Sequence, residues 1–481
     1  FGATNNFTGE GTVSNSTSGA ANVRSTPITP EVVQVNPKGR GVYAVEIATI
    51  SSTGTPDFEK TGTKTWGVTY GANTNYSTAS ATDSKMKYSF VSEITTLDVD
   101  ANGYVDRLYA TDLGGNLWRF DVGAITKTSS GTGNLIFSAN TPSSTNTDVG
   151  RKFFFKPVAT LETKASVPAR GNDALIFMGS GDREHPTNTS VIDRLYAIRD
   201  KGQTSAITEI SQTVPADPVC PSGTPAELNL LDFTEDQLQS STIANTSTNP
   251  DTPTEGSAEY WLNKLNRCTN YGWYIRLNRI IDTPPPPAWN STTTYVTGDK
   301  VFYKEHVYDC LTNNTDNAPD SDDSKWEDKG SYTTAGEKVL APPTLSNKII
   351  YFTTFTPGSS INTDPCKPSN LGTSRLYTLD YATGEAVINN CNINTNTKCD
   401  SNTITNNEVN NDTLTLSNKR AQSKTGGNVL LRTDRTKILG SGIASGVIQI
   451  GDKVFVGAGG SIVSETTKKG GQVINLYWGQ K

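Results

Sequence analysis

The sequence predicts an all-β fold, a modified β-propeller with long insertions, and three observations support this prediction. One strand pattern recurs four times, its apolar residues alternate as in half-buried strands, and long helical patterns are nearly absent. A recurring strand with its turn cannot bury its own apolar face. We therefore expect several such units to pack against one another, as the sheets of a radial β-architecture do.

The four copies of the strand share an aromatic residue at the same position. They occupy residues 40–45 (RGVYAV), 107–111 (RLYAT), 194–198 (RLYAI) and 375–379 (RLYTL). Two copies are followed by a glycine-containing turn, DLGGN or DYATGE. The spacing between copies is irregular, so long insertions separate the repeats. We expect four or five blades.

Further apolar runs fill the space between the copies. Strands are predicted at 89–94, 153–159, 174–179, 272–277, 348–355, 446–450, 453–457 and 473–478, and the best short helix pattern lies at 257–266. We predict four segments: a flexible or loop segment at 1–35, the first part of the propeller at 36–283, an inserted module at 284–330, and the second part of the propeller at 331–481.

Composition excludes several classes of protein. The 481-residue chain has a formal net charge of −6 with 19% charged residues, so it lacks the excess of basic residues that is typical of nucleic-acid-binding proteins. No run of about 18 apolar residues is present, so we expect no membrane-spanning helix. Only two histidines occur, which leaves few candidates for histidine-based catalysis. We expect a non-enzymatic protein. The chain begins at Phe1 without a signal-peptide pattern, so we expect a mature or trimmed product.

The stretch from Leu97 to Val122 carries the main candidate site. Four oxygen-bearing side chains alternate around Gly103, as in the first part of an EF-hand calcium loop, and the Tyr104 carbonyl falls between them. These four are Asp98, Asp100, Asn102 and Asp106. Position twelve, a bidentate glutamate in an EF-hand, is Tyr109, and no helix pattern flanks the loop. An Asp/Asn/Gly turn without a metal is the alternative. We predict a Ca²⁺ loop set into a β-sheet.

A β-hairpin follows the loop, with strands at 107–111 and 117–122. Apolar and polar residues alternate along its second strand, which gives it one apolar face and one polar face. Asp112 begins the DLGGN turn. It could join the metal ion or cap the turn, and we favour the turn.

His185 lies in the segment 179–186 (GSGDREHP), where an acid, a base and an imidazole stand together. Such a group could suggest acid–base chemistry. No second histidine or nucleophile accompanies it, so we interpret the segment as a polar loop that connects blades.

Six cysteines without a CxxC pair favour an oxidising compartment over a zinc or redox site. The sequence cannot fix their pairing. Cys391 with Cys399 would close a short loop, and Cys220 with Cys268 would close a long polar excursion. Cys310 and Cys366 would then form a third disulfide or stay free thiols.

The inserted module follows a stiff proline run at 284–287. Its residues match a pattern of aromatic, Gly-Asp and proline positions: Trp289, Tyr295, Gly298, Asp299, Val301, Tyr303, Tyr308, Pro319 and Trp326. This pattern resembles small three-stranded chitin-binding modules. The aromatic pair that usually follows the strand carrying Tyr308 is replaced here by LTNN, and we expect Trp289 and Trp326 to form a small core.

The calcium loop with its hairpin, the GRGVYAVEI strand, the GWYI strand and the TTFTP…DPC stretch before SRLYTLDYATG form a joint pattern. Together they resemble the C-terminal β-propeller domain of the PilC/PilY family of type IV pilus tip adhesins. The resemblance implies export through the periplasm to the cell surface and the pilus tip. It also implies minor pilins and a host or surface receptor, possibly a glycan, as partners, and a role in pilus extension, adhesion and twitching motility. Calcium ligands carry over to Asp98, Asp100, Asn102, the Tyr104 carbonyl and Asp106.

Two other functions fit parts of the same sequence. RLYALD-like blades also occur in quinoprotein oxidoreductases, which have a calcium site at the ring centre. The inserted module would suit a secreted polysaccharide-binding protein.

Overall fold

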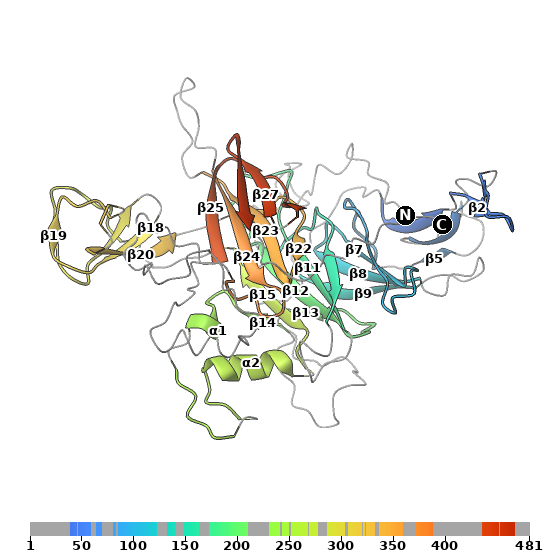
Figure 1. Cartoon of the computed structure of the whole chain (residues 1–481), viewed down its shortest axis with the longest axis horizontal. Helices are drawn as coiled ribbons and strands as arrows, with labels where there is room; N and C mark the ends of the chain where they lie inside the picture. The colour runs from blue at the N-terminus through green and yellow to red at the C-terminus, as the bar shows by residue number, and fades with distance from the viewer. Residues whose placement is uncertain are drawn as a thin grey trace, which may run out of the picture.

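The computed structural model confirms an all-β fold built mainly from antiparallel sheets (Figure 1). The two helices among the described residues are short, α1 (Gln237–Ser240) and α2 (Ala258–Asn266). The structure describes residues 39–45, 47–58, 64–69, 80–82, 85–122, 132–140, 149–162, 173–209, 230–240, 243–249, 252–267, 269–277, 286–303, 306–319, 321–322, 324–331, 336–358, 372–387, 435–451 and 453–466. The predicted segment 1–35 and the predicted strand 473–478 lie outside these residues.

Five sheets follow one another along the chain, and we number them in that order. The first has the order β1-β4-β5, the second β13-β9-β8-β7-β6, the third β10-β11-β12-β15-β14, the fourth β21-β23-β24-β25 with β22 paired to β23, and the fifth β26-β27-β28.

The bounds of the strands in these sheets are as follows. They are β1 (Gly41–Val45), β4 (Lys64–Thr69), β5 (Ser80–Thr82), β6 (Thr95–Leu97), β7 (Arg107–Thr111), β8 (Asn116–Asp121), β9 (Thr132–Ser138), β10 (Val158–Leu161), β11 (Ala174–Gly179), β12 (Arg194–Asp200), β13 (Ile207–Thr208), β14 (Leu231–Asp232), β15 (Gly272–Arg276), β21 (Lys338–Val339), β22 (Thr344–Ser346), β23 (Ile349–Thr356), β24 (Thr373–Asp380), β25 (Thr436–Ser441), β26 (Ile448–Ile450), β27 (Lys453–Ala458) and β28 (Ser461–Thr466). A separate hairpin pairs β2 (Thr49–Ile50) with β3 (Pro56–Asp57).

Each sheet packs face to face on the next, because successive side chains of a strand point to opposite faces. In β7, Leu108 belongs to the core shared with the first sheet, and Tyr109 belongs to the core shared with the third. In β24, Tyr377 packs toward the third sheet and Leu376 toward the fifth. The result is a consecutive row of blade-like sheets. No core cluster of the described residues joins the first sheet to the fifth.

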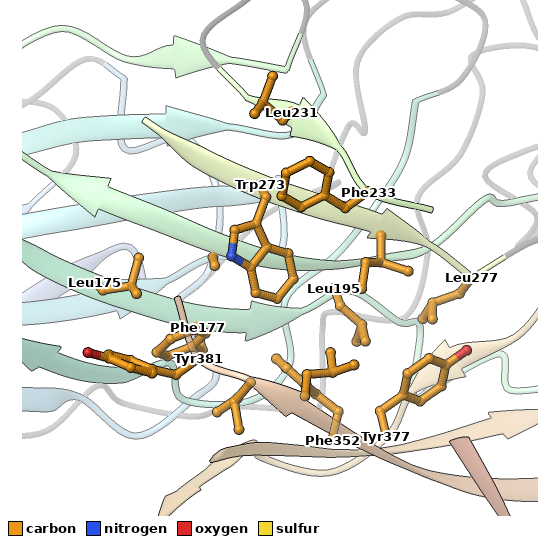
Figure 2. Close-up of a cluster of buried hydrophobic side chains, with 14 of the residues drawn as sticks. Leu175, Phe177, Leu195, Leu231, Phe233, Trp273, Leu277, Phe352, Tyr377 and Tyr381 are labelled. Atoms are coloured by element: carbon orange, nitrogen blue, oxygen red, sulfur yellow. The ribbon is translucent and has the colours of Figure 1, made fainter. Parts of the chain in front are cut away.

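The largest of these cores lies between the third and fourth sheets (Figure 2). Trp273 of β15 is fully buried there, together with Phe177 of β11 and Phe352 of β23. The Trp273 indole Nε1 donates to the Ala382 carbonyl over 3.1 Å, so its one polar atom is paired. The third and fourth sheets therefore bury apolar side chains of their facing surfaces against each other.

One predicted strand is wrong, and a second is wrong in part. Residues 89–94 are irregular, and the strand that enters the calcium loop is the shorter β6. Phe90 packs edge-on against Trp118 at 6.1 Å between ring centroids, so its apolar character serves packing and not strand pairing. The predicted strand 153–159 begins only at Val158, after Pro157, which lacks a backbone N–H. Phe153 nevertheless packs edge-on against Tyr196, at 5.9 Å.

The predicted helix at 257–266 is confirmed as α2. Ser257 is its N-cap, and its side chain accepts a hydrogen bond from the Tyr260 backbone N–H over 3.2 Å. No helix among the described residues is long and apolar enough to cross a membrane.

The inserted module has the predicted three-stranded sheet, β17 (Lys300–Tyr303), β18 (His306–Cys310) and β20 (Trp326–Ser331) in the order β17-β18-β20. A small two-stranded sheet pairs β16 (Thr294–Tyr295) with β19 (Asn314–Thr315). Figure 1 shows this module to one side of the five sheets.

Aromatic side chains form the core of the module. Trp326 is 1% exposed and meets Tyr295 edge-on with 5.2 Å between ring centroids. Trp289 is half-buried and packs on the same core. Cys310 is a buried free thiol. The other five cysteines lie outside the described residues, as do the predicted pairs 391–399 and 220–268.

Candidate metal centre

The candidate calcium loop is the connection of a β-hairpin within the second sheet. It runs from Asp98 to Asp106, between β6 and β7, and Leu97 pairs with Arg107 at its base. The Asp106 N–H donates to the Leu97 carbonyl over 3.0 Å, and the Val122 N–H donates to the Asp106 carbonyl over 2.7 Å. The base of the loop is therefore fixed to the strand β7 and to the end of β8.

Three acidic side chains converge inside this loop. Asp98, Asp100 and Asp106 each have a carboxylate oxygen within 4.8 Å of those of the other two. The Gly103 N–H donates to Asp98 Oδ2 over 2.7 Å, and the Val99 N–H donates to Asp106 Oδ2 over 2.7 Å. The backbone thus holds like charges together on a partly exposed surface, where a cation would relieve their repulsion.

Asn102 and Tyr104 complete the predicted set. The Asn102 Nδ2 donates to Asp100 Oδ2 over 2.9 Å, and Asn102 Oδ1 accepts the Tyr104 N–H over 2.8 Å. The Tyr104 side chain is 77% exposed, so it leaves the loop for solvent. The turn needs left-handed backbone at Gly103, with φ of 90°, and at Ala101, with φ of 59°.

The donor chemistry of this loop fits a hard divalent cation. All of its candidate ligands are carboxylate, amide or carbonyl oxygens, which calcium prefers. Tyr109, at position twelve, cannot contribute, because its ring is fully buried between the second and third sheets. The loop therefore offers up to five protein oxygen ligands, from Asp98, Asp100, Asn102, the Tyr104 carbonyl and Asp106, and water would complete a calcium shell.

Asp112 caps the DLGGN turn, at the opposite end of β7 from the calcium loop. Its Oδ1 accepts the Gly114 N–H over 2.8 Å and the Asn116 N–H over 3.1 Å, and its Oδ2 accepts Trp118 Nε1 over 2.8 Å. Burial raises the pKa of the Asp112 carboxyl to about 6, against these hydrogen bonds. These contacts confirm that Asp112 caps the turn.

The polar face of the hairpin carries a buried charge cluster that sequence reasoning missed. Asp200, at the end of β12 in the third sheet, has a fully buried side chain. It accepts the Tyr109 hydroxyl over 2.7 Å and Arg119 Nη1 over 2.6 Å, and Arg107 Nη1 lies 3.5 Å away. We call Asp200 with its three partners the Asp200 clamp.

A second cluster of the same kind links these two sheets, but here the acid belongs to the second sheet and the arginine and tyrosine belong to the third. Arg194 and Tyr196 of β12 both contact Glu209, which follows β13 of the second sheet. Arg151 lies 3.7 Å from Glu209 as well. We call this group the Glu209 clamp. The recurring Arg-x-Tyr pattern was the available signal, since residues two apart in a strand share a face.

The segment around His185 forms a second acidic and imidazole cluster. Asp182, Glu184 and His185 lie close enough to share an ion. However, Lys152 Nζ contacts Asp182 Oδ2 over 2.8 Å, and both side chains are buried. Although burial raises the Asp182 pKa, Lys152 and His185 outweigh it and hold that pKa below its usual value. An ammonium group already neutralises this acid, which agrees with a polar connecting loop.

A sequence match to a known protein supports the resemblance drawn from the motifs. The chain is 23% identical over 318 residues to the type IV pilus biogenesis factor PilY1 homolog of Xylella fastidiosa. This match covers 64% of the chain and 15% of that relative, so the chain spans a small part of the relative's length. The crystal structure of the Pseudomonas aeruginosa PilY1 C-terminal domain aligns with 85% of the chain and 65% of that domain, at 14% identity and a TM-score of 0.37. No family model matches the chain.

Proposed function

We propose that the protein is a calcium-binding pilus adhesin or assembly factor and not an enzyme, because the chain is similar in sequence to a type IV pilus biogenesis factor. The sequence match to the PilY1 homolog carries the pilus assignment. The convergence of Asp98, Asp100 and Asp106 in one hairpin loop supports the calcium assignment.

In this proposal, the protein acts on the cell surface at the pilus tip. It reaches the tip by export through the periplasm and binds minor pilins there, together with a host or surface receptor. Calcium binding supports pilus extension, adhesion and twitching motility.

Calcium would act on the loop by local electrostatics. Asp98, Asp100, Asn102, the Tyr104 carbonyl and Asp106 would hold the ion, which would neutralise three acids that backbone N–H groups already hold together. The bound ion would fix the entry into β7 and keep this edge of the second sheet in one shape. Without the ion, repulsion among the three carboxylates would loosen the loop.

The calcium assignment is tested by Asp106→Ala. Isothermal titration calorimetry with Ca²⁺ should show binding to the wild type and none to the variant, because Asp106 accepts the Val99 N–H across the loop and supplies one of three carboxylates. Glu93→Gln is a matched control. It removes one acid of a surface ion pair, with a side chain 77% exposed, and should leave the affinity unchanged. Equal affinities for the wild type and Asp106→Ala would show that the loop is not the site.

The pilus assignment needs a separate test in cells that produce the full-length protein. Immunogold labelling should place the protein at pilus tips, and cross-linking should recover minor pilins. The Asp106→Ala variant should reach the surface while twitching zones shrink. Labelling confined to the cell body, with normal twitching after deletion of the protein, would argue against a pilus role.

A further inference from the structure

We propose that calcium binding at loop 98–106 is coupled to the packing of the second sheet on the third through the Asp200 clamp, with Arg107 as the positioning residue. This inference rests on the proposed calcium site. It adds a regulation of that site: the Asp200 clamp, acting through Arg107, sets the calcium affinity, and calcium in turn tightens this clamp.

The first step of the coupling is covalent and short. Asp106 is a proposed ligand, and Arg107 is the next residue in the chain. The backbone of Arg107 pairs with Leu97 on one side and with Asp121 on the other. A shift of the loop therefore moves the backbone that carries the Arg107 guanidinium.

The second step crosses from one sheet to the other. The Arg107 guanidinium lies 3.5 Å from Asp200 on the third sheet and 3.6 Å from Asp121 on its own sheet. Asp200 is fully buried, and two further side chains contact it, Tyr109 from the strand of Arg107 and Arg119 from the strand of Asp121. A buried carboxylate is sensitive to the loss of a cationic neighbour, because no water is present to solvate the charge in its place.

The Asp200 clamp also holds the turn that follows β12. The Gly202 N–H donates to Asp200 Oδ1 over 2.9 Å, and Arg119 Nη1 donates to the Gln203 carbonyl over 3.2 Å. Weakening of the Arg107 contact would therefore loosen a turn of the third sheet. By linkage, a loosened turn would make the loop geometry that binds calcium less favourable.

The Glu209 clamp provides a matched control within the same joint. Its acid is also buried, and it also links an Arg-x-Tyr pair to the neighbouring sheet. Its cationic and tyrosine partners lie in β12 and at Arg151, and none is next to the calcium loop in the chain. Loss of Glu209 should weaken the joint without acting on Arg107.

The test compares Asp200→Asn with Glu209→Gln in the whole chain. Titration calorimetry with Ca²⁺ should show an affinity at least about five-fold weaker for Asp200→Asn, within the usual range of coupling between sites. Glu209→Gln should bind within about two-fold of the wild type. If Asp200→Asn fails to fold, Tyr109→Phe takes its place. This variant removes one hydroxyl contact to Asp200 and should weaken calcium binding by a smaller factor.

A second measurement needs no metal. In calcium-free protein, amide hydrogen exchange at Val99 and Asn102 should be faster in Asp200→Asn than in Glu209→Gln, because both amides donate to acids of the loop. Wild-type affinity and unchanged exchange in Asp200→Asn, or in Tyr109→Phe, would overturn the coupling. Failure of the wild type to bind calcium would instead refute the calcium site, while the exchange comparison would still report on the link from the clamp to the loop.

Discussion

Replacing Asp112 by alanine should destabilise the protein more than any loss of a surface charge. Its carboxylate is the shared acceptor for the DLGGN turn, and it receives the Gly114 and Asn116 N–H groups and the Trp118 indole N–H. All of these groups lie in buried residues. Alanine would leave them without an acceptor, in a space from which water is excluded.

The magnitude follows from two opposing effects. Each buried donor left unpaired costs about 1–3 kcal/mol. Against this, the variant no longer has to bury a charge. The pKa of Asp112 rises from 3.8 to about 6 on burial, which corresponds to roughly 3 kcal/mol against the ionised form at neutral pH. We expect a net loss of about 2–4 kcal/mol in the free energy of unfolding for Asp112→Ala.

Urea unfolding at pH 7, followed by tryptophan fluorescence, measures this loss. Asp112→Asn keeps one acceptor oxygen and carries no charge, so it should lose less than Asp112→Ala. Glu93→Ala, which removes only the exposed ion pair with Lys156, should lose less than about 1 kcal/mol. A loss below about 1 kcal/mol for Asp112→Ala would refute the view that this acid organises the turn.

Three further predictions concern other parts of the chain. Gly272→Ala should cost more than about 2 kcal/mol in urea unfolding, because φ is 128° and a Cβ would lie 1.9 Å from the Ala197 carbonyl oxygen; Gly54→Ala, with positive φ but open space, should cost less. Trp326→Ala should make the inserted module the first site of limited proteolysis, since loss of a buried tryptophan costs about 3–5 kcal/mol; initial cleavage elsewhere would contradict its core role. Burial raises the pKa of Asp193 to about 6, so its stabilising contribution is complete below about pH 4 and is lost as pH rises through 6. The free energy of unfolding of the wild type should therefore fall more between pH 5 and pH 7 than that of Asp193→Asn. Equal falls would contradict a raised pKa of Asp193 in the folded protein.

Much of the candidate loop could be predicted from its residues. The alternation of acids around Gly103 identifies three side chains that the structure brings together, because a tight turn points alternate residues at one centre. The same pattern left the role of Asp112 open. Its contacts depend on Trp118, whose indole reaches across the hairpin, and on burial between sheets, which local spacing does not show.

Alternation of apolar residues by itself determined the all-β class and strands such as β7, β12 and β24, because each strand must present side chains to two faces. It could not show that the polar face of the hairpin is also buried. Arg119 is 4% exposed, because its guanidinium contacts Asp200, which lies 81 residues later in the chain. Only the tertiary structure decided that Arg107 and Tyr109 meet Asp200, because pairing between sheets depends on how whole sheets stack and not on neighbours in the chain.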